Sequence, residues 1–182
     1  MSRQATDTLR RTWRADLTKA GLRLLPGPGF GVTHLVRRAR VEAHLEFDDG
    51  PRFQLTATHP GVPRDLLVRL EGERGVIRRT FGPGDVRTWD EAFDALAEVR
   101  GDPAWVLAAL NPGTRKRLTD ALNAGLTVKG GRLQGALVCE RPAVLSAWVG
   151  FAADLVTRLS LPTDRVGPNL LRRAEAESEP RL

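Results

Sequence analysis

The chain is poor in the residues that build most metal and redox sites. It has a single cysteine, Cys139, no tyrosine and three histidines. One cysteine excludes an intramolecular disulfide framework and any zinc or iron–sulfur site made from several cysteines. No cofactor or metal is therefore expected.

Lysine is also scarce, since 25 of the 28 basic residues are arginines, a bias typical of a GC-rich bacterial genome. The first 21 residues contain no continuous apolar run, which predicts no signal peptide and a cytoplasmic location. The longest apolar stretch, residues 143–161, contains Asp154 and Arg158. We expect a core helix there and no membrane contact, although its length approaches a bilayer span.

Length and composition indicate one soluble globular domain. The chain has 182 residues, of which 41% are apolar and 27% charged. Residues 1–162 are expected to form a single domain. Residues 163–182 are rich in proline, arginine and glutamate and offer little to bury, which predicts a flexible C-terminal tail.

Positive charge is concentrated near the N-terminus. Residues 1–40 carry nine basic and two acidic side chains, a net of +7, so the rest of the chain sums to −1 against the overall +6. Anionic ligands or partners would be bound there. The candidate anion-binding or partner-binding residues are Arg10, Arg11, Arg14, Arg37, Arg38 and Arg40.

Two periodic patterns stand out in the first third of the chain. Leu9, Trp13, Leu17, Ala20 and Leu24 recur every three or four residues, which predicts an amphipathic helix that Pro26 and the following glycines end. Apolar residues then occupy the odd positions of 39–47 and 53–57, the alternation of two half-buried strands. Odd positions must face odd positions, which predicts a three-residue loop at 49–51 with Asp48 opposite Arg52.

The remainder predicts more hairpins and helices. Strands are expected at 66–71, 76–81, 126–128 and 132–139, and helices at 103–110, 112–125 and 142–161. The long C-terminal helix should bury Leu145, Trp148, Ala152, Leu155 and Leu159. The fold class is α+β: an antiparallel sheet built from hairpins, packed by the N-terminal amphipathic helix, a short helix pair and the long C-terminal helix.

Residues 88–100 fit both a capped helix and a strand. Several motifs from this point on resemble an uncharacterised bacterial α+β domain family of unknown function, over residues 85–161. They are Phe93-Asp94, Val99-Arg100-Gly101-Asp102, Leu107, Leu110, Leu118 and Lys129-Gly130-Gly131-Arg132-Leu133, followed by a C-terminal helix. The resemblance implies a strand after Phe93 and supplies no activity. We therefore predict a capped turn at 88–92 followed by a strand.

Three groups of residues could carry chemistry. His44 and His59 with Glu42 or Glu46 could form a two-histidine, one-carboxylate metal site, but a solvated sheet face is the preferred interpretation. Asp90, Glu91 and Asp94 could serve acid–base chemistry or bind a divalent cation, or simply begin a helix. Cys139 is interpreted as a small, partly buried core residue.

No nucleotide-binding loop, catalytic elbow or metal-ligand spacing is present. We therefore expect a non-enzymatic bacterial protein-interaction or assembly domain, with a protein partner or self-association and no small-molecule ligand. The alternative is nucleic-acid binding to the phosphate backbone through the basic N-terminal quarter. A third hypothesis is an enzyme of unknown reaction that uses the acidic or histidine-containing group.

Overall fold

The computed structural model describes residues 3–26, 30–47, 51–71 and 85–160 and confirms the α+β fold class. Within these residues, eight antiparallel strands form one sheet in the order β1-β2-β3-β4-β8-β7-β5-β6. The strands are β1 (Arg23–Leu24), β2 (Gly31–Val36), β3 (Ala39–Phe47), β4 (Pro51–Thr58), β5 (Leu67–Leu70), β6 (Ala97–Arg100), β7 (Thr127–Lys129) and β8 (Arg132–Val138). The helices are α1 (Arg3–Lys19), α2 (Glu91–Leu96), α3 (Pro103–Ala109), α4 (Pro112–Asn123) and α5 (Pro142–Leu159).

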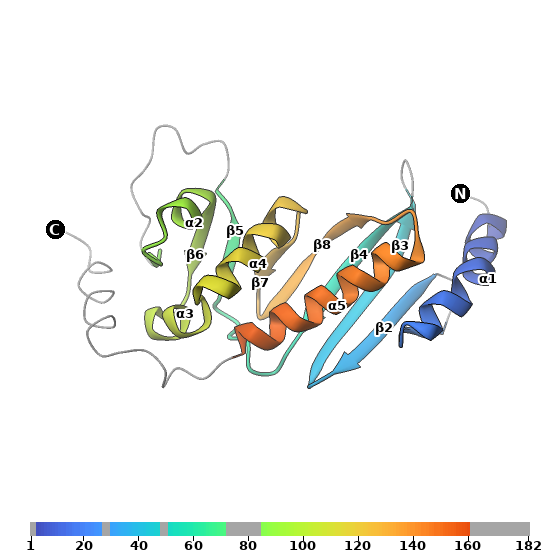
Figure 1. Ribbon diagram of the computed structural model, residues 1–182, viewed down its shortest axis with the longest axis horizontal. Helices are drawn as coiled ribbons and strands as arrows, with labels where there is room; N and C mark the ends of the chain where they lie inside the picture. The colour runs from blue at the N-terminus through green and yellow to red at the C-terminus, as the bar shows by residue number, and fades with distance from the viewer. Residues whose placement is uncertain (1–2, 27–29, 48–50, 72–84, 161–182) are drawn as a thin grey trace.

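The helices cover one face of the sheet, with α5 lying across its central strands (Figure 1). The odd positions of β3 and β4 point to this face, and Val41, Ala43 and Phe53 are fully buried there. The indole of Trp13 on α1 stacks on Phe53 at 5.9 Å between ring centroids. The even positions form the other face, where His44 and Arg52 are exposed.

The β3–β4 hairpin has the predicted parity but not the predicted register. Leu45 lies opposite Phe53, and Glu46 opposite Arg52, so the pairing is displaced by two residues. The reason is that β4 begins at Pro51, a residue that the parity argument places in the loop. Proline is tolerated as the first residue of a strand, because a missing donor costs little there. Asp48 lies outside the described residues.

The first strands were not predicted. Helix α1 ends at Lys19 rather than continuing to Leu24, because Gly21 takes a left-handed conformation with φ of 80°. The amide of Leu22 donates to the carbonyl of Leu17 at 2.9 Å, as in a Schellman motif. The chain then forms β1 and β2, and β2 pairs with β3 through a two-residue turn at Arg37-Arg38.

Residues 88–100, which fit both a helix and a strand by sequence, contain the helix α2 followed by the strand β6. Asp90 caps α2, its side chain accepting from the amide of Phe93, and β6 begins at Ala97. The prediction of a strand immediately after residue 92 is therefore wrong for 93–96, since the cap starts a helix of six residues first. Helices α3 and α4 and the β7–β8 hairpin are confirmed. The strand expected at 76–81 and the tail at 163–182 lie outside the described residues.

Candidate functional site

Helix α5 has two apolar stripes, and only one of them faces the sheet. Leu145, Val149, Ala152, Val156 and Leu159 recur at steps of four and three and are at most 1% exposed. By length and composition, α5 is also the one helix among the described residues that could span a membrane. Its buried stripe makes it the central core helix of this fold.

The second stripe is partly open to solvent. Arg141, Val144, Trp148 and Phe151 follow one another at steps of three, four and three, so they lie along one side of α5 next to the buried stripe. The prediction that Trp148 is buried against the sheet is therefore wrong: its side chain packs on the edge of the core and remains partly exposed.

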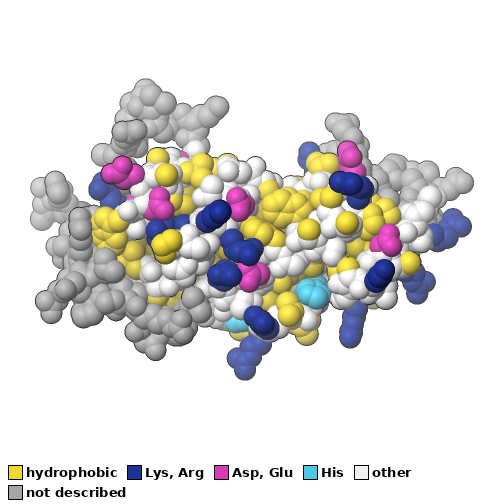
Figure 2. All heavy atoms as spheres, viewed as in Figure 1, with side chains coloured by type: hydrophobic (Ala, Val, Ile, Leu, Met, Phe, Trp, Pro, Cys, Tyr) yellow, Lys and Arg dark blue, Asp and Glu magenta, His cyan; other side chains and the backbone are white. Residues whose placement is uncertain are grey.

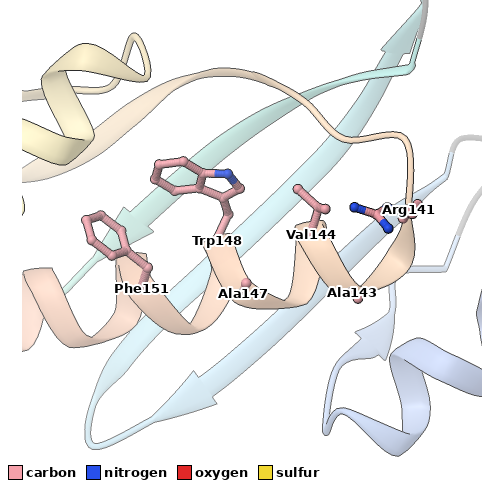
Figure 3. Close-up of a pocket in the computed structure, with 6 residues that line it drawn as sticks. All are labelled: Arg141, Ala143, Val144, Ala147, Trp148 and Phe151. Atoms are coloured by element: carbon pink, nitrogen blue, oxygen red, sulfur yellow. The ribbon is translucent and has the colours of Figure 1, made fainter.

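These residues line a shallow groove of about 440 Å³, together with Ala143 and Ala147. Figure 3 shows the side chains of Val144, Trp148 and Phe151 on the same side of α5, with the guanidinium of Arg141 turned towards Val144. Figure 2 shows hydrophobic side chains exposed in the middle of this face, where α5 crosses the sheet, with Lys or Arg and Asp or Glu side chains beside them. We call this surface the α5 groove.

Aromatic contacts fix one end of the α5 groove. The rings of Trp148 and Phe151 meet edge to face, with centroids 5.2 Å apart and planes at 77°. The guanidinium carbon of Arg117, on α4, lies 5.5 Å from the centroid of Phe151, within range of a cation–π interaction. Both rings are therefore held in place without being covered.

Arginines lie at both ends of the α5 groove. Asp154 binds two arginines through the same oxygen, Nε of Arg117 at 3.2 Å and Nε of Arg158 at 2.8 Å, which leaves a net charge of about +1 at that end. At the other end Arg141 is exposed, and no carboxylate in the described part of the chain lies within 4.0 Å of its guanidinium. Arg141 is also the N-cap residue of α5 and gives no capping hydrogen bond.

The α5 groove is suited to binding rather than to catalysis. Its lining contains one charged side chain, Arg141, and no carboxylate, histidine, cysteine or hydroxyl that could act as a base or a nucleophile. Five of the six lining residues belong to α5 and the sixth, Arg141, is its N-cap residue, so a small molecule would remain largely exposed, whereas ligand pockets usually enclose most of the ligand. What the surface offers is two aromatic rings and a valine to an apolar side chain of a partner.

The predicted arginine set is divided between two places. Arg11 and Arg14 are exposed on α1, and the side chain of Arg10 lies outside the described residues. Arg37 and Arg38 are exposed at the β2–β3 turn, which lies at the lower edge of Figure 1, whereas α1 lies at its right-hand end. The six residues therefore do not form one patch.

One member of the set is already engaged. Nη2 of Arg40 lies 2.6 Å from Oε1 of Glu42, its neighbour on the exposed face of β3.

Arg37 and Arg38 both have positive φ, 48° and 68°, a conformation that arginine rarely adopts. The turn thus presents two exposed cations on a strained backbone.

The histidines do not come together. His44 lies opposite Gln54, and His59 follows five residues later along the chain, which is about 17 Å in an extended strand. Nδ1 of His59 accepts from the amide of Gly61 at 3.0 Å, while Nε2 of His44 lies 3.9 Å from Glu42. Among the described residues, no group of three or more His, Cys, Asp or Glu is arranged to hold a metal ion.

The acidic cluster caps and anchors helix α2. The carboxylate of Asp94 accepts from the amide and the hydroxyl of Thr88, at 3.0 and 2.8 Å. Asp90 accepts hydrogen bonds from the amide of Phe93 and from Nε of Arg115. Both bonds lower the pKa of Asp90 below the ordinary carboxyl value, and the bond from the Phe93 amide has the larger effect. Both carboxylates are therefore occupied by structural hydrogen bonds.

Cys139 is a core residue, as expected, but it is fully rather than partly buried. Burial raises the pKa of its thiol to about 11, so almost none of it is thiolate at neutral pH. The side chain is accordingly unsuited to act as a nucleophile.

Reasoning from the sequence did not find Val144, Phe151 or Arg117 as functional candidates. The signal for Val144 and Phe151 was the 3-4-3 spacing from Arg141 to Phe151, but it runs beside a core stripe of the same period. Arg117 lies on α4 and reaches Phe151 only through the tertiary structure. Comparisons with protein-family models, curated proteins and solved structures give no significant match. The resemblance of residues 85–161 to an uncharacterised bacterial family stays a prediction.

Proposed function

We propose that this protein is a non-enzymatic interaction domain that binds another protein through the α5 groove. The observation that carries the proposal is the partly exposed Trp148–Phe151 pair, held in fixed geometry between the guanidinium of Arg117 and the exposed Arg141. Tryptophan, other aromatic residues and arginine are the side chains most enriched at the energetic centres of protein interfaces.

Burial of Trp148 and Phe151 by a partner is energetically more favourable than their exposure to water. A large apolar side chain gains about 1.5–3 kcal/mol when it is fully buried. Trp148 and Phe151 realise only part of that gain in the isolated chain, since both are partly exposed. Because contacts within the chain already fix their rings, little conformational entropy would be lost when a partner covers them.

The same geometry supports the interaction proposal over the enzyme hypothesis. The residues that sequence reasoning offered for catalysis are engaged elsewhere: Asp90 and Asp94 hold α2, and Cys139 is buried. The described candidate arginines of the nucleic-acid hypothesis lie in two groups, on α1 and around the β2–β3 turn, rather than in one patch for phosphates.

Site-specific photo-crosslinking in the source cells tests the proposal. A photoreactive residue would replace Ala147, which is exposed in the α5 groove, and in a control chain Ala95, which is exposed on α2. We expect a discrete protein adduct from position 147 that disappears when Trp148 is also changed to Ser. Equal adducts from both positions, adducts only with nucleic acid, or none at position 147 would contradict the proposal.

A further inference from the structure

Resting on the proposed function, we infer that the partner of the α5 groove is an acidic amphipathic helix. Its apolar side chains would pack on Val144, Trp148 and Phe151, and its carboxylates would lie near Arg141 and Arg117 at the two ends. This inference names the partner's chemistry, which the proposed function leaves open.

The length of the α5 groove sets the length of the partner segment. From Arg141 to Phe151 is about 15 Å along a helix axis, or nearly three turns. A partner helix of about 10–12 residues matches that span and can insert a ridge of side chains beside those of α5. Apolar anchors spaced three and four residues apart are the usual form of such helix-in-groove binding.

The charge at the two ends of the α5 groove indicates that the partner carries negative charge. Arg141 and the Arg117–Asp154–Arg158 group give the two ends of the α5 groove a net charge of about +2. The N-terminus of α5 adds positive potential, because it has no capping side chain and no acidic residue in its first turn. Glu140 is exposed just before this helix but does not line the groove, so it offsets only part of that potential.

A second copy of this chain fits less well than an acidic partner. In a two-fold symmetric dimer the same patch serves both subunits, so cations would face cations across the contact. Like charges placed opposite each other disfavour a partner. A groove formed by one helix and its N-cap residue is also far smaller than the roughly 800 Å² per subunit of a stable interface.

Two synthetic peptides test the inference on the full-length protein. Each has about 14 residues, with leucines spaced three and four apart; one carries glutamates at both ends and the other carries lysines at the same positions. We expect micromolar binding of the glutamate peptide in fluorescence anisotropy at about 0.1 M salt, and at least ten-fold weaker binding of the lysine peptide.

Matched variants separate specific binding from the general basicity of the chain. Arg141→Glu should weaken the glutamate peptide about ten-fold and strengthen the lysine peptide. Arg64→Glu changes the net charge equally at an exposed loop position beside the β7–β8 turn, at the opposite end of β8 from Arg141, and should leave both affinities within two-fold. Circular dichroism and thermal unfolding would show that both variants are folded.

The outcomes distinguish the two proposals. Equal binding of both peptides, with both abolished by Trp148→Ser, would retain the α5 groove as a binding surface and overturn the acidic partner. A protein adduct at position 147 whose partner contact contains no acidic helix would do the same. Self-association in sedimentation that Trp148→Ser removes would replace the acidic helix with a second copy of the chain. Absence of both peptide binding and adducts would overturn the proposed function itself.

Discussion

Changing both residues of the β2–β3 turn should raise the stability of the protein. Two-residue hairpin loops favour positive φ at both central positions, and Asn-Gly is the sequence best suited to them. Here both positions are arginine, with φ of 48° and 68°. We predict that the double variant Arg37→Asn, Arg38→Gly is more stable than the natural chain.

The magnitude follows from the backbone. A left-handed conformation costs an ordinary residue about 1–2 kcal/mol, so two arginines together store about 2–4 kcal/mol. Glycine makes the unfolded chain more flexible, which offsets about 0.5–1 kcal/mol of the relieved strain. Asparagine retains a small part of the strain. The net expectation is a gain of about 1–2 kcal/mol, or a rise in Tm of about 3–6 °C for a chain of this size.

The assay is chemical and thermal unfolding of the double variant beside Arg37→Gln, Arg38→Gln. The glutamine pair removes the same two charges but keeps side chains that resist positive φ, so its stability should stay within about 0.5 kcal/mol of the natural chain. Equal stability of the two variants would refute the strain argument and assign any gain to relief of charge repulsion. If the turn binds polynucleotide phosphates, the glutamine pair should also lower the slope of log affinity against log salt by nearly one unit for each phosphate that an arginine had neutralised.

Three further outcomes are expected. Gly135→Ala should cost about 1–3 kcal/mol in denaturant unfolding, because its methyl group would meet backbone of the loop before β7, whereas Gly150→Ala, with open space around it on α5, should be neutral or stabilising; equal effects would contradict this. Cys139 should react with a disulfide reagent at pH 8 only on unfolding, since its pKa is about 11 and the thiol is buried; rapid labelling of the folded chain would place it at the surface. Asp90→Ala should cost about 0.5–2 kcal/mol. Because the folded-state pKa of Asp90 is lowered, its contribution is complete above the ordinary carboxyl pKa and disappears as pH falls through the lowered value; a difference from wild type that persists in acid would contradict the cap and the Arg115 contact.

The strongest local signals in the sequence determined most of the elements. Alternation over residues 39–47 and 53–57 gave both strands, and Asn111-Pro112 and Asp102-Pro103 marked the starts of α4 and α3. These signals suffice because a strand face or a helix cap depends on residues only a few positions apart. The face of each residue in the hairpin was predictable for the same reason, although its register was not.

Local signals failed where a turn lacked its usual residues, and where two strand registers fitted the same pattern of apolar residues. Strand β2 was missed because its turn carries Arg37-Arg38 in place of the glycine or asparagine that marks such a hairpin. The register of β3 with β4 could shift by two without exposing an apolar residue, so only the assembled sheet decided it.

The α5 groove was decided by tertiary structure alone. Helix α5 is apolar on more than one side, and the stripes through Val149 and through Trp148 have the same helical period. Periodicity states which residues share a side but not which side meets the sheet. That choice depends on how α5 lies across β3 and β4 and on where Arg117 of α4 contacts Phe151. Contacts between segments far apart in the chain leave no mark on local spacing, and they are what left Trp148 partly exposed.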